Sequence, residues 1–380
     1  MIKPAFGSAL LLAAGFSTAA AQLISIRTVP ISQAHQFAIF PSQTVAMGGV
    51  SIALRDSLLD PFTNPATGSR VGATRFFGTP STYSVSSKAG SGRTLPVGAL
   101  TRSNSWYGGL WLALQQVDPS RQPEIQGPIF LGACPACDAE LIDIDRVKRS
   151  QGNSYAFATA GRELAPGLSV GGSFLWSHLN AIDGVDMLYA RSLRVEQRGD
   201  AFDARIGLVK EWAGDRTLEA LVLHNRFGTE HDVYFLDTFW DPGAQQFIQQ
   251  PRIEHNLDRT HTWGLHVEYE QPLSANGWHA GVVATINQMN HPKIPNYSIM
   301  NIPRDPGHSS AFNLGFGLAR RLNGSTLGID LIYEPIWSHT WADAESPVES
   351  RLGKTIPAGG MTIENHFRFA NGIARMGLAQ

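Results

Sequence analysis

Two cysteines, Cys134 and Cys137, lie in the stretch GACPACDAE and give the chain its most obvious candidate for side-chain chemistry. A Cys-x-x-Cys pair can be a redox motif, half of a zinc site or a small disulfide loop. A thioredoxin-like redox motif needs a βαβ context, which is not visible here. A tetrahedral zinc site needs two more ligands at suitable spacing, and the chain has no other Cys. Because exported proteins most often oxidise such pairs, we predict a structural disulfide and no metal site.

The histidines are the second candidate for chemistry. His261 and His266 are five residues apart on one predicted strand, so they point to opposite faces and cannot share a metal ion. His224 and His231 lie on either side of a predicted strand end, with no third ligand in pattern. Ser and Asp are plentiful, but nothing singles out the nucleophile that a hydrolase requires. We therefore expect no enzymatic activity and no cofactor.

The first 21 residues have the three regions of a secretory signal peptide. Lys3 supplies the positive charge, 9–16 are apolar but too few to span a bilayer, and three alanines precede Gln22. A buried N-terminal helix is the alternative, but nothing polar gives this segment an amphipathic face. The formal net charge of −2 shows no basic surplus, so nucleic acid is not an expected partner. No other stretch approaches eighteen apolar residues, which excludes a helical membrane protein.

From residue 70 onward the sequence alternates with a period of two. In 259–270 (RTHTWGLHVEYE) the odd positions from 261 are His, Trp, Leu, Val and Tyr, and the even positions are Thr, Thr, Gly, His, Glu and Glu. The same alternation recurs in 311–321, 326–334 and 361–369. A two-residue period is that of a β-strand.

The connections between the predicted strands are alternately short and long. Thirteen strands are predicted, over 70–80, 92–102, 105–116, 152–162, 167–178, 200–212, 216–226, 259–270, 277–288, 310–321, 324–337, 360–370 and 372–380. The last two are joined by an Asn371-Gly372 hairpin signal. Long connections are predicted at 117–151, 179–199, 227–256, 289–309 and 338–359. Tight turns at one end and long loops at the other are typical of an outer-membrane barrel.

A soluble all-β domain would show the same alternation, but its strands would average five or six residues. The predicted strands run to ten or twelve residues, which matches a tilted crossing of a bilayer. Aromatic residues crowd the strand ends, as in an interfacial girdle. We therefore predict an all-β, transmembrane antiparallel barrel. An odd strand count leaves the barrel without its closing strand, so we expect about fourteen strands, the last one missing from this sequence.

The stretch AMGGVSIALRDSLLDPFTNPA (46–66), between the signal peptide and the first strand, resembles the N-terminal segment of FadL-type outer-membrane transporters and of their PorV-type relatives. The resemblance implies a fourteen-stranded barrel in the bacterial outer membrane, whose N-terminal segment folds into the lumen as a hatch. The expected organisation is a signal peptide at 1–21, a hatch at 22–69 and a barrel at 70–380. The alternative is that 46–66 merely begins a barrel strand.

The predicted hatch residues are small, acidic or turn-forming. Gly48 and Gly49 allow close contact with the barrel wall. Pro65 biases Asn64 toward an extended conformation before the chain turns at Ala66. Asp56 and Asp60 could pair with Arg205 or Arg368 if those arginines face the lumen.

Two functions are implied by the resemblance. The first is passive uptake of hydrophobic small molecules such as long-chain fatty acids, with capture by the outer loops and lateral exit through the wall. The loops carry the residues of a predicted ligand groove: Met187, Tyr189, Tyr234, Phe235, Phe239 and Trp240. The alternative is a PorV-like component of a protein secretion or surface-attachment system, with secretion-system proteins as partners. In both cases outer-membrane lipids surround the barrel.

Overall fold

The computed structural model describes residues 39–44, 47–84, 91–118, 150–182, 194–273, 276–291, 307–322, 324–342 and 363–379. Two short helices, α1 (Asp60–Thr63) and the 3₁₀ helix η3 (Pro65–Arg70), precede the strands. Among the described residues, no helix is long and apolar enough to cross a bilayer. The first strands are β1 (Arg75–Gly78), β2 (Ser81–Ser84), β3 (Ser91–Ser103), β4 (Trp106–Asp118), β5 (Gln151–Ala165) and β6 (Leu168–Leu179). They are followed by β7 (Arg194–Trp212), β8 (Arg216–Asp241), β9 (Gln246–Pro272), β10 (Trp278–His291), β11 (Gly307–Leu322), β12 (Ser325–Ala342) and β13 (Ile363–Ala379).

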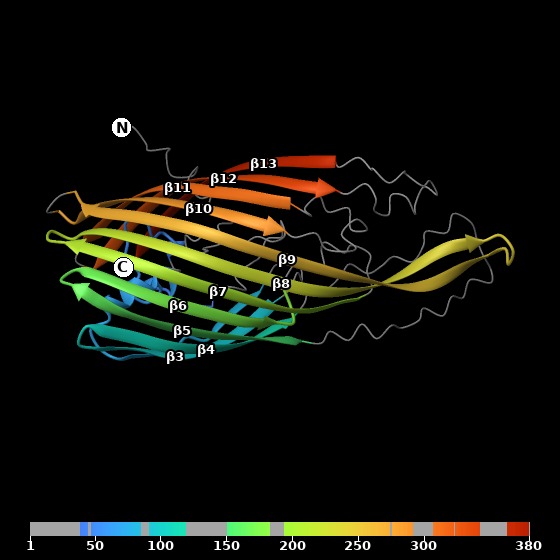
Figure 1. The fold of residues 1–380 in the computed structure, drawn as a ribbon, viewed down its shortest axis with the longest axis horizontal. Coiled ribbons are helices and arrows are strands. Elements are labelled where there is room, and N and C mark those ends of the chain that lie inside the picture. The colour runs from blue at the N-terminus through green and yellow to red at the C-terminus, as the bar shows by residue number, and fades with distance from the viewer. Residues whose placement is uncertain are drawn as a thin grey trace, which may run out of the picture.

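These strands form one thirteen-stranded antiparallel sheet, which confirms the predicted all-β fold. From β3 to β13 each strand pairs with its neighbours in the chain, and the strands run side by side around a blue N-terminal segment in Figure 1. β1 and β2 both pair with β3, the first with Val97–Leu100 and the second with Ser91–Thr94. Among the described residues β13 pairs only with β12, so the sheet is an open path between its two end strands.

The predicted hairpin at Asn371-Gly372 is wrong, because β13 runs through it without a break. Asn371 lies opposite Glu334 and Gly372 opposite Tyr333 on β12. The hairpin signal is overridden because β12 is long enough to pair with residues on both sides of it. The predicted strand at 70–80 also differs: η3 occupies its start, and Pro80, which has no N–H to donate, separates β1 from β2. Because β1 and β2 lie along the same edge of β3, the described strands occupy twelve positions in the sheet, and the odd count that predicted a missing strand is not observed.

The predicted long loop at 227–256 is also wrong, because these residues continue β8 and β9 as a paired hairpin. The pairing extends from Thr217 and Glu270 to Asp241 and Gln246. The Asp241 carboxylate caps the turn by accepting hydrogen bonds from the amides of Gly243 (2.8 Å) and Ala244 (3.2 Å). The hairpin projects beyond the other strands, at the right of Figure 1. The turn signal Pro242-Gly243 could have identified it from the sequence.

The two faces of the sheet are reversed relative to those of a water-soluble protein. On β9 the outward Trp263 is 60% exposed, whereas Thr262 on the inner face is fully buried. The same contrast recurs on β4 and on β7 to β12, where the exposed residues are Leu110, Leu112, Leu114, Ile206, Val222, Leu265, Val282, Leu314, Phe316 and Leu331. Buried inner positions include Gln115, Asn153, Asp203, Asn225, Thr260, His266, Thr285, Asn287, Asn313 and Asp330. An apolar outer face with a polar inner face is the arrangement of a transmembrane barrel.

Tryptophans mark the two edges of the apolar band. Trp106, Trp212 and Trp278 lie where their strands meet the short turns. Trp176 pairs with Phe202 and Trp263 pairs with Gln288, each ten residues along the strand from Trp212 or Trp278. Ten residues span about 33 Å along a strand and, at a tilt of about 40°, about 25 Å across the membrane. This is about the height of the apolar band of outer-membrane barrels.

Candidate functional site

The N-terminal residues 39–44 and 47–71, here called the inner segment, lie against the inner face of the sheet near the short turns. Figure 1 shows this segment in blue, surrounded by strands. Its contacts run around the sheet. Met47 packs on Gly377 of β13, Val50 on Gly328 of β12 and Ile52 on Gly281 of β10. A side chain would collide with the backbone of the inner segment at Gly281 and Gly377, and with the side chains of Val50 and Leu54 at Gly328.

Polar contacts continue the attachment. The amides of Ser51 and Ile52 donate hydrogen bonds to the Asp330 carboxylate of β12 (2.8 and 3.3 Å). Asp330 is fully buried, so its charge is compensated by these two N–H groups of the inner segment. A buried carboxylate without donors would be costly, which makes Asp330 a fixed attachment point.

Gly48 and Gly49 have the conformations that the sequence predicts for them. Their φ angles are +68° and +77°, in the left-handed region that favours glycine. The turn is closed by hydrogen bonds from the amides of Met47 (2.9 Å) and Gly49 (3.2 Å) to the Thr44 carbonyl.

Asp56 organises the inner segment internally, and no ion pair joins it to an arginine among the described residues. Its carboxylate accepts hydrogen bonds from the amides of Gln43 (2.7 Å) and Thr44 (3.1 Å) and, on its other side, of Leu58 (3.0 Å) and Leu59 (3.2 Å). Arg205, its expected partner, instead pairs with Asp203 (2.5 Å) and donates to the carbonyls of Phe62 and Thr63. The side chain of Arg368 lies outside the described residues.

Asn64, Pro65 and Ala66 fasten the segment to four strands. Asn64 is extended before the proline (φ −115°, ψ 109°), as predicted, and its side chain accepts a hydrogen bond from the Ala66 amide at the start of η3. The Asn64 amide group also donates to Glu219 of β8 (3.1 Å) and to a β7 carbonyl. Pro65 packs on Gly171 of β6, and the Tyr107 hydroxyl of β4 donates to the Ala66 carbonyl (3.1 Å).

Two arginines of the inner segment form ion pairs with the ends of β7, β8 and β9. Arg70 lies 2.8 Å from both Glu211 and Glu219, and 3.4 Å from Asp60. Arg55 lies 3.1 Å from Glu270. Because these carboxylates come from three neighbouring strands, the two arginines attach the inner segment to β7, β8 and β9 together.

Burial shifts the pKa of two of these groups. Burial and the neighbouring Glu219 raise the pKa of Asp60 well above its ordinary value, although Arg70 opposes the shift. Burial lowers the pKa of the Arg70 guanidinium, but Glu219, Asp60 and Glu211 outweigh it and raise the pKa, so Arg70 remains charged.

A small cavity lies between the inner segment and the strands β8 and β9. Its volume is about 50 Å³, and it lies among Arg55, Asp60, Glu219, His266 and Glu268. It has room for only a few water molecules.

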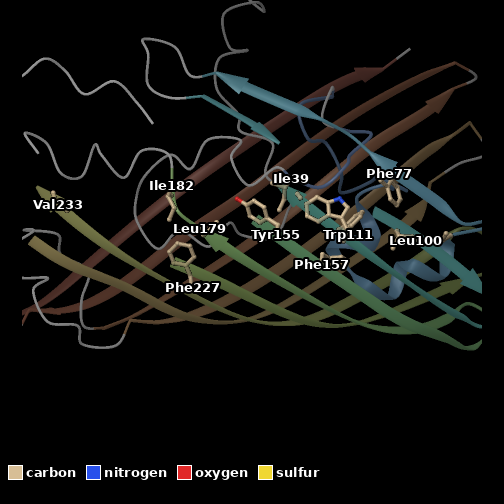
Figure 2. Packing of buried hydrophobic residues seen from close by; sticks show 13 residues of the cluster. Ile39, Phe77, Leu100, Trp111, Tyr155, Phe157, Leu179, Ile182, Phe227 and Val233 are labelled. Carbon is tan, nitrogen blue, oxygen red and sulfur yellow. The ribbon is translucent and has the colours of Figure 1, made fainter. Parts of the chain in front are cut away.

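A stripe of apolar side chains runs along the inner face above the inner segment (Figure 2). The stripe consists of Phe77, Leu100, Trp111, Ala113, Tyr155, Phe157, Leu179, Ile182, Phe227 and Val233, together with Ile39, Phe40 and Phe62 of the inner segment. The Phe62 ring lies 5.1 Å from Phe157 and 6.0 Å from Phe77, measured between ring centroids. The stripe therefore connects the long-loop end of β8 with the inner segment and with β1, at the edge of the sheet.

Polar residues flank the stripe, so the apolar surface covers only part of the inner face. On β8, Asn225 is buried two residues from Phe227. Thr262, Asn287 and Asn313 occupy the corresponding inner face of β9, β10 and β11. The side chains of the stripe are buried, and Trp111 and Phe157 pack on Phe40 and Phe62 of the inner segment.

The predicted ligand groove is only partly described. Tyr234 and Trp240 lie on the projecting part of β8, and the side chains of Phe235 and Phe239 are outside the described residues. Met187, Tyr189, the predicted disulfide Cys134–Cys137 and the signal peptide also lie outside them. The sequence reasoning missed the charged residues Arg55, Arg70, Glu211, Glu219 and Glu270. The three glutamates could have been found from the sequence, because each is an acidic residue at an inward-facing position of its strand, near a short turn.

No protein-family model matches the chain, and no curated protein matches it. Two solved structures are similar at low identity. The iron transporter FrpB of Neisseria meningitidis (F5-1 variant, apoprotein) is 10% identical with a TM-score of 0.35, over 81% of this chain and 44% of that one. A mutant of the ferric enterobactin receptor PfeA of Pseudomonas aeruginosa, in complex with enterobactin, is 11% identical with a TM-score of 0.34, over 72% and 43%. This chain spans less than half the length of either, and similarity at this level carries no information on function.

Proposed function

We propose that the protein is a bacterial outer-membrane barrel that takes up hydrophobic small molecules of the long-chain fatty-acid class. The observation that carries the proposal is the apolar stripe, which crosses an otherwise polar inner face from the long-loop end to the inner segment. A membrane barrel does not need aromatic side chains on its inner face for contact with lipid. Their presence is best explained by an apolar molecule that moves along them.

The outer-membrane location is supported by the apolar band. Its height of about 25 Å is smaller than the hydrocarbon core of an average bilayer, at about 30 Å, and the bacterial outer membrane is thinner than average.

The inner segment acts as the hatch in this proposal. It closes the end of the barrel near the short turns, so a ligand on the stripe leaves either after the hatch moves or sideways through the wall. The stripe ends at Phe77 and Leu100, on β1 and β3. There the edge of the sheet is interrupted between Gly78 and Ser81, which favours sideways exit into the membrane.

The experiment is uptake of a fluorescent long-chain fatty acid by proteoliposomes containing the full chain. Phe227→Asn places an amide in the middle of the stripe, and we expect uptake to fall at least about tenfold, since the contact of a buried Phe is worth about 2 kcal/mol. Asn225→Ser, on the same strand and face, is the matched control and should leave uptake unchanged. Equal uptake by Phe227→Asn and wild type would contradict the proposal.

A further inference from the structure

The hairpin of β8 and β9 continues far above the rest of the barrel. β6 ends at Leu179, which pairs with Gly199 of β7, and Gly199 in turn pairs with Thr229 of β8. On the other side of the hairpin, the last pair between β9 and β10 is His261 with Asn290. The projecting hairpin, residues 229–258, lies beyond both ends. β7 accompanies it only as far as Tyr234, which pairs with Arg194. From there to the turn, in the described part of the chain, β8 and β9 pair only with each other (Figure 1).

The tip of this hairpin is apolar and exposed. Trp240 and Phe247 pair across the two strands with ring centroids 5.1 Å apart, and they are 50% and 48% exposed. Ile253, opposite Tyr234, is 49% exposed on the same face. Large aromatic side chains that remain exposed in water are characteristic of protein interaction sites.

The apolar tip is not a continuation of the membrane band. Between the two lies a polar belt that includes Arg226, His261, Glu230 and the pair Asp232–His255, whose side chains are 2.6 Å apart. Trp240 is sixteen residues beyond His224, which pairs with Trp263 at the edge of the band. That separation corresponds to about 50 Å along the strand, which keeps the tip out of the bilayer.

The projecting hairpin is acidic although the whole chain is nearly neutral. Its acidic residues are Glu230, Asp232, Asp237, Asp241, Glu254 and Asp258, and its single basic residue is Arg252, which gives a net charge of −5 with histidines neutral. The flanking end of β7 adds Arg194, Arg198 and Glu196, so the net charge of the region is −4.

The charge and the shape of the projecting hairpin together indicate which class of molecule it binds. A small ligand needs a concave pocket, and a two-stranded ribbon offers none. A second copy docked through the same hairpin, or an anionic lipopolysaccharide, would bring like charge to the acidic hairpin. We propose that the projecting hairpin is a docking site for an extracellular protein that presents an apolar groove bordered by Lys and Arg. Trp240 and Phe247 would fill the groove of the partner, and the acidic residues of the projecting hairpin would pair with the basic border of that groove.

The test places the photo-cross-linker p-benzoylphenylalanine at position 240 of the full chain in intact native cells, with the lipid-facing position of Leu114 as the control. We expect a protein adduct at 240 that the control lacks. The partner, identified by mass spectrometry and purified, should bind the barrel in nanodiscs. Its Kd should rise at least about tenfold with Trp240→Ser/Phe247→Ser. Binding should also weaken in high salt and with Glu230→Lys.

Four results would overturn the proposal: no adduct, an adduct with lipopolysaccharide only, an adduct with a second copy only, or a partner whose affinity the double variant leaves unchanged. Heat-modifiable migration in gels verifies that each variant has folded as a barrel. Phe227→Asn, in the apolar stripe, tests uptake and leaves the side chains of the hairpin tip unchanged. Failure of docking and failure of uptake are thus separate outcomes.

Discussion

Arg70 is the side chain whose loss should most weaken the attachment of the inner segment to the barrel. It pairs with Glu211, Glu219 and Asp60, and the side chains of Arg70 and Glu219 are 18% and 17% exposed. Breaking a fully buried pair costs about 3–5 kcal/mol, and an exposed pair contributes about 1 kcal/mol or less. For these partly buried groups we expect Arg70→Ala to cost about 2 kcal/mol, which is about a 30-fold increase in the detached population of the inner segment.

Hydrogen exchange measures this effect directly. In nanodiscs, amides of residues 55–70 should exchange about 30-fold faster in Arg70→Ala, while amides of the central strands keep their wild-type rates. Ion conductance across planar bilayers should rise in parallel, because the detached segment no longer closes the barrel. Arg70→Lys should be intermediate, since one ammonium cannot replace the guanidinium fork.

The matched control is Arg216→Ala, which removes an exposed arginine from the neighbouring β7–β8 turn. Its exchange rates and conductance should equal those of the wild type. Unchanged exchange in Arg70→Ala, or an equal increase in Arg216→Ala, would refute the role of Arg70 in holding the inner segment.

Three further changes to the inner segment have distinct expected outcomes. Gly48→Val forces a β-branched residue into φ +68° and should loosen the segment by at least about 1–2 kcal/mol in hydrogen exchange, whereas Gly72→Val, in open space, should have no effect. Tyr107→Phe removes the hydroxyl that is shared between the carbonyls of Val170 (2.7 Å) and Ala66 (3.1 Å), and it should raise exchange around η3 about fivefold, for a loss of about 1 kcal/mol. Because the attached state raises the pKa of Asp60, ionisation of Asp60 weakens attachment as pH rises from about 4. Asp60→Asn should therefore exchange more slowly than wild type at neutral pH and equally at low pH.

The sequence predicted the architecture because lipid imposes a simple rule on each strand. Every second side chain from Trp263 to Tyr269 is apolar, and the structure exposes Trp263 and Leu265 on the outer face. The short turns were equally visible, since Gly167, Gly214, Gly277 and Gly324 adopt positive φ at four of them. Both signals are local, so they can be read without knowledge of tertiary contacts.

Long-range pairing could not be predicted in the same way. The Asn371-Gly372 signal is local, and only the length of β12, to which these residues pair, overrides it. The β8–β9 hairpin was missed because its residues were assigned to a loop by their distance from the alternating strands. The Pro242-Gly243 turn at its centre is the local signal that indicates a hairpin.

The sequence predicted the turns of the inner segment but not which side chains of the strands this segment contacts. Gly48, Gly49, Asn64 and Pro65 carry backbone information, and they have the conformations expected of them. Asp56 and Asp60 were predicted as possible partners of Arg205 or Arg368, but nearby backbone amides satisfy the Asp56 carboxylate, and Asp60 lies beside Arg70. Which arginine meets which carboxylate depends on strand register and on the path of the inner segment, and neither is encoded in local pattern.

The most direct test of the apolar stripe as a ligand path is photoaffinity labelling with a diazirine-bearing long-chain fatty acid, mapped by mass spectrometry. Adjacent residues on β4 face opposite sides: Trp111 and Ala113 lie in the stripe, while Leu112 and Leu114 face outward. Our account predicts labels on Trp111, Tyr155 and Phe227 that excess unlabelled fatty acid abolishes, and labels on Leu112 and Leu114 that it does not. Labelling confined to the outward residues, or labels on the stripe that do not saturate, would contradict it.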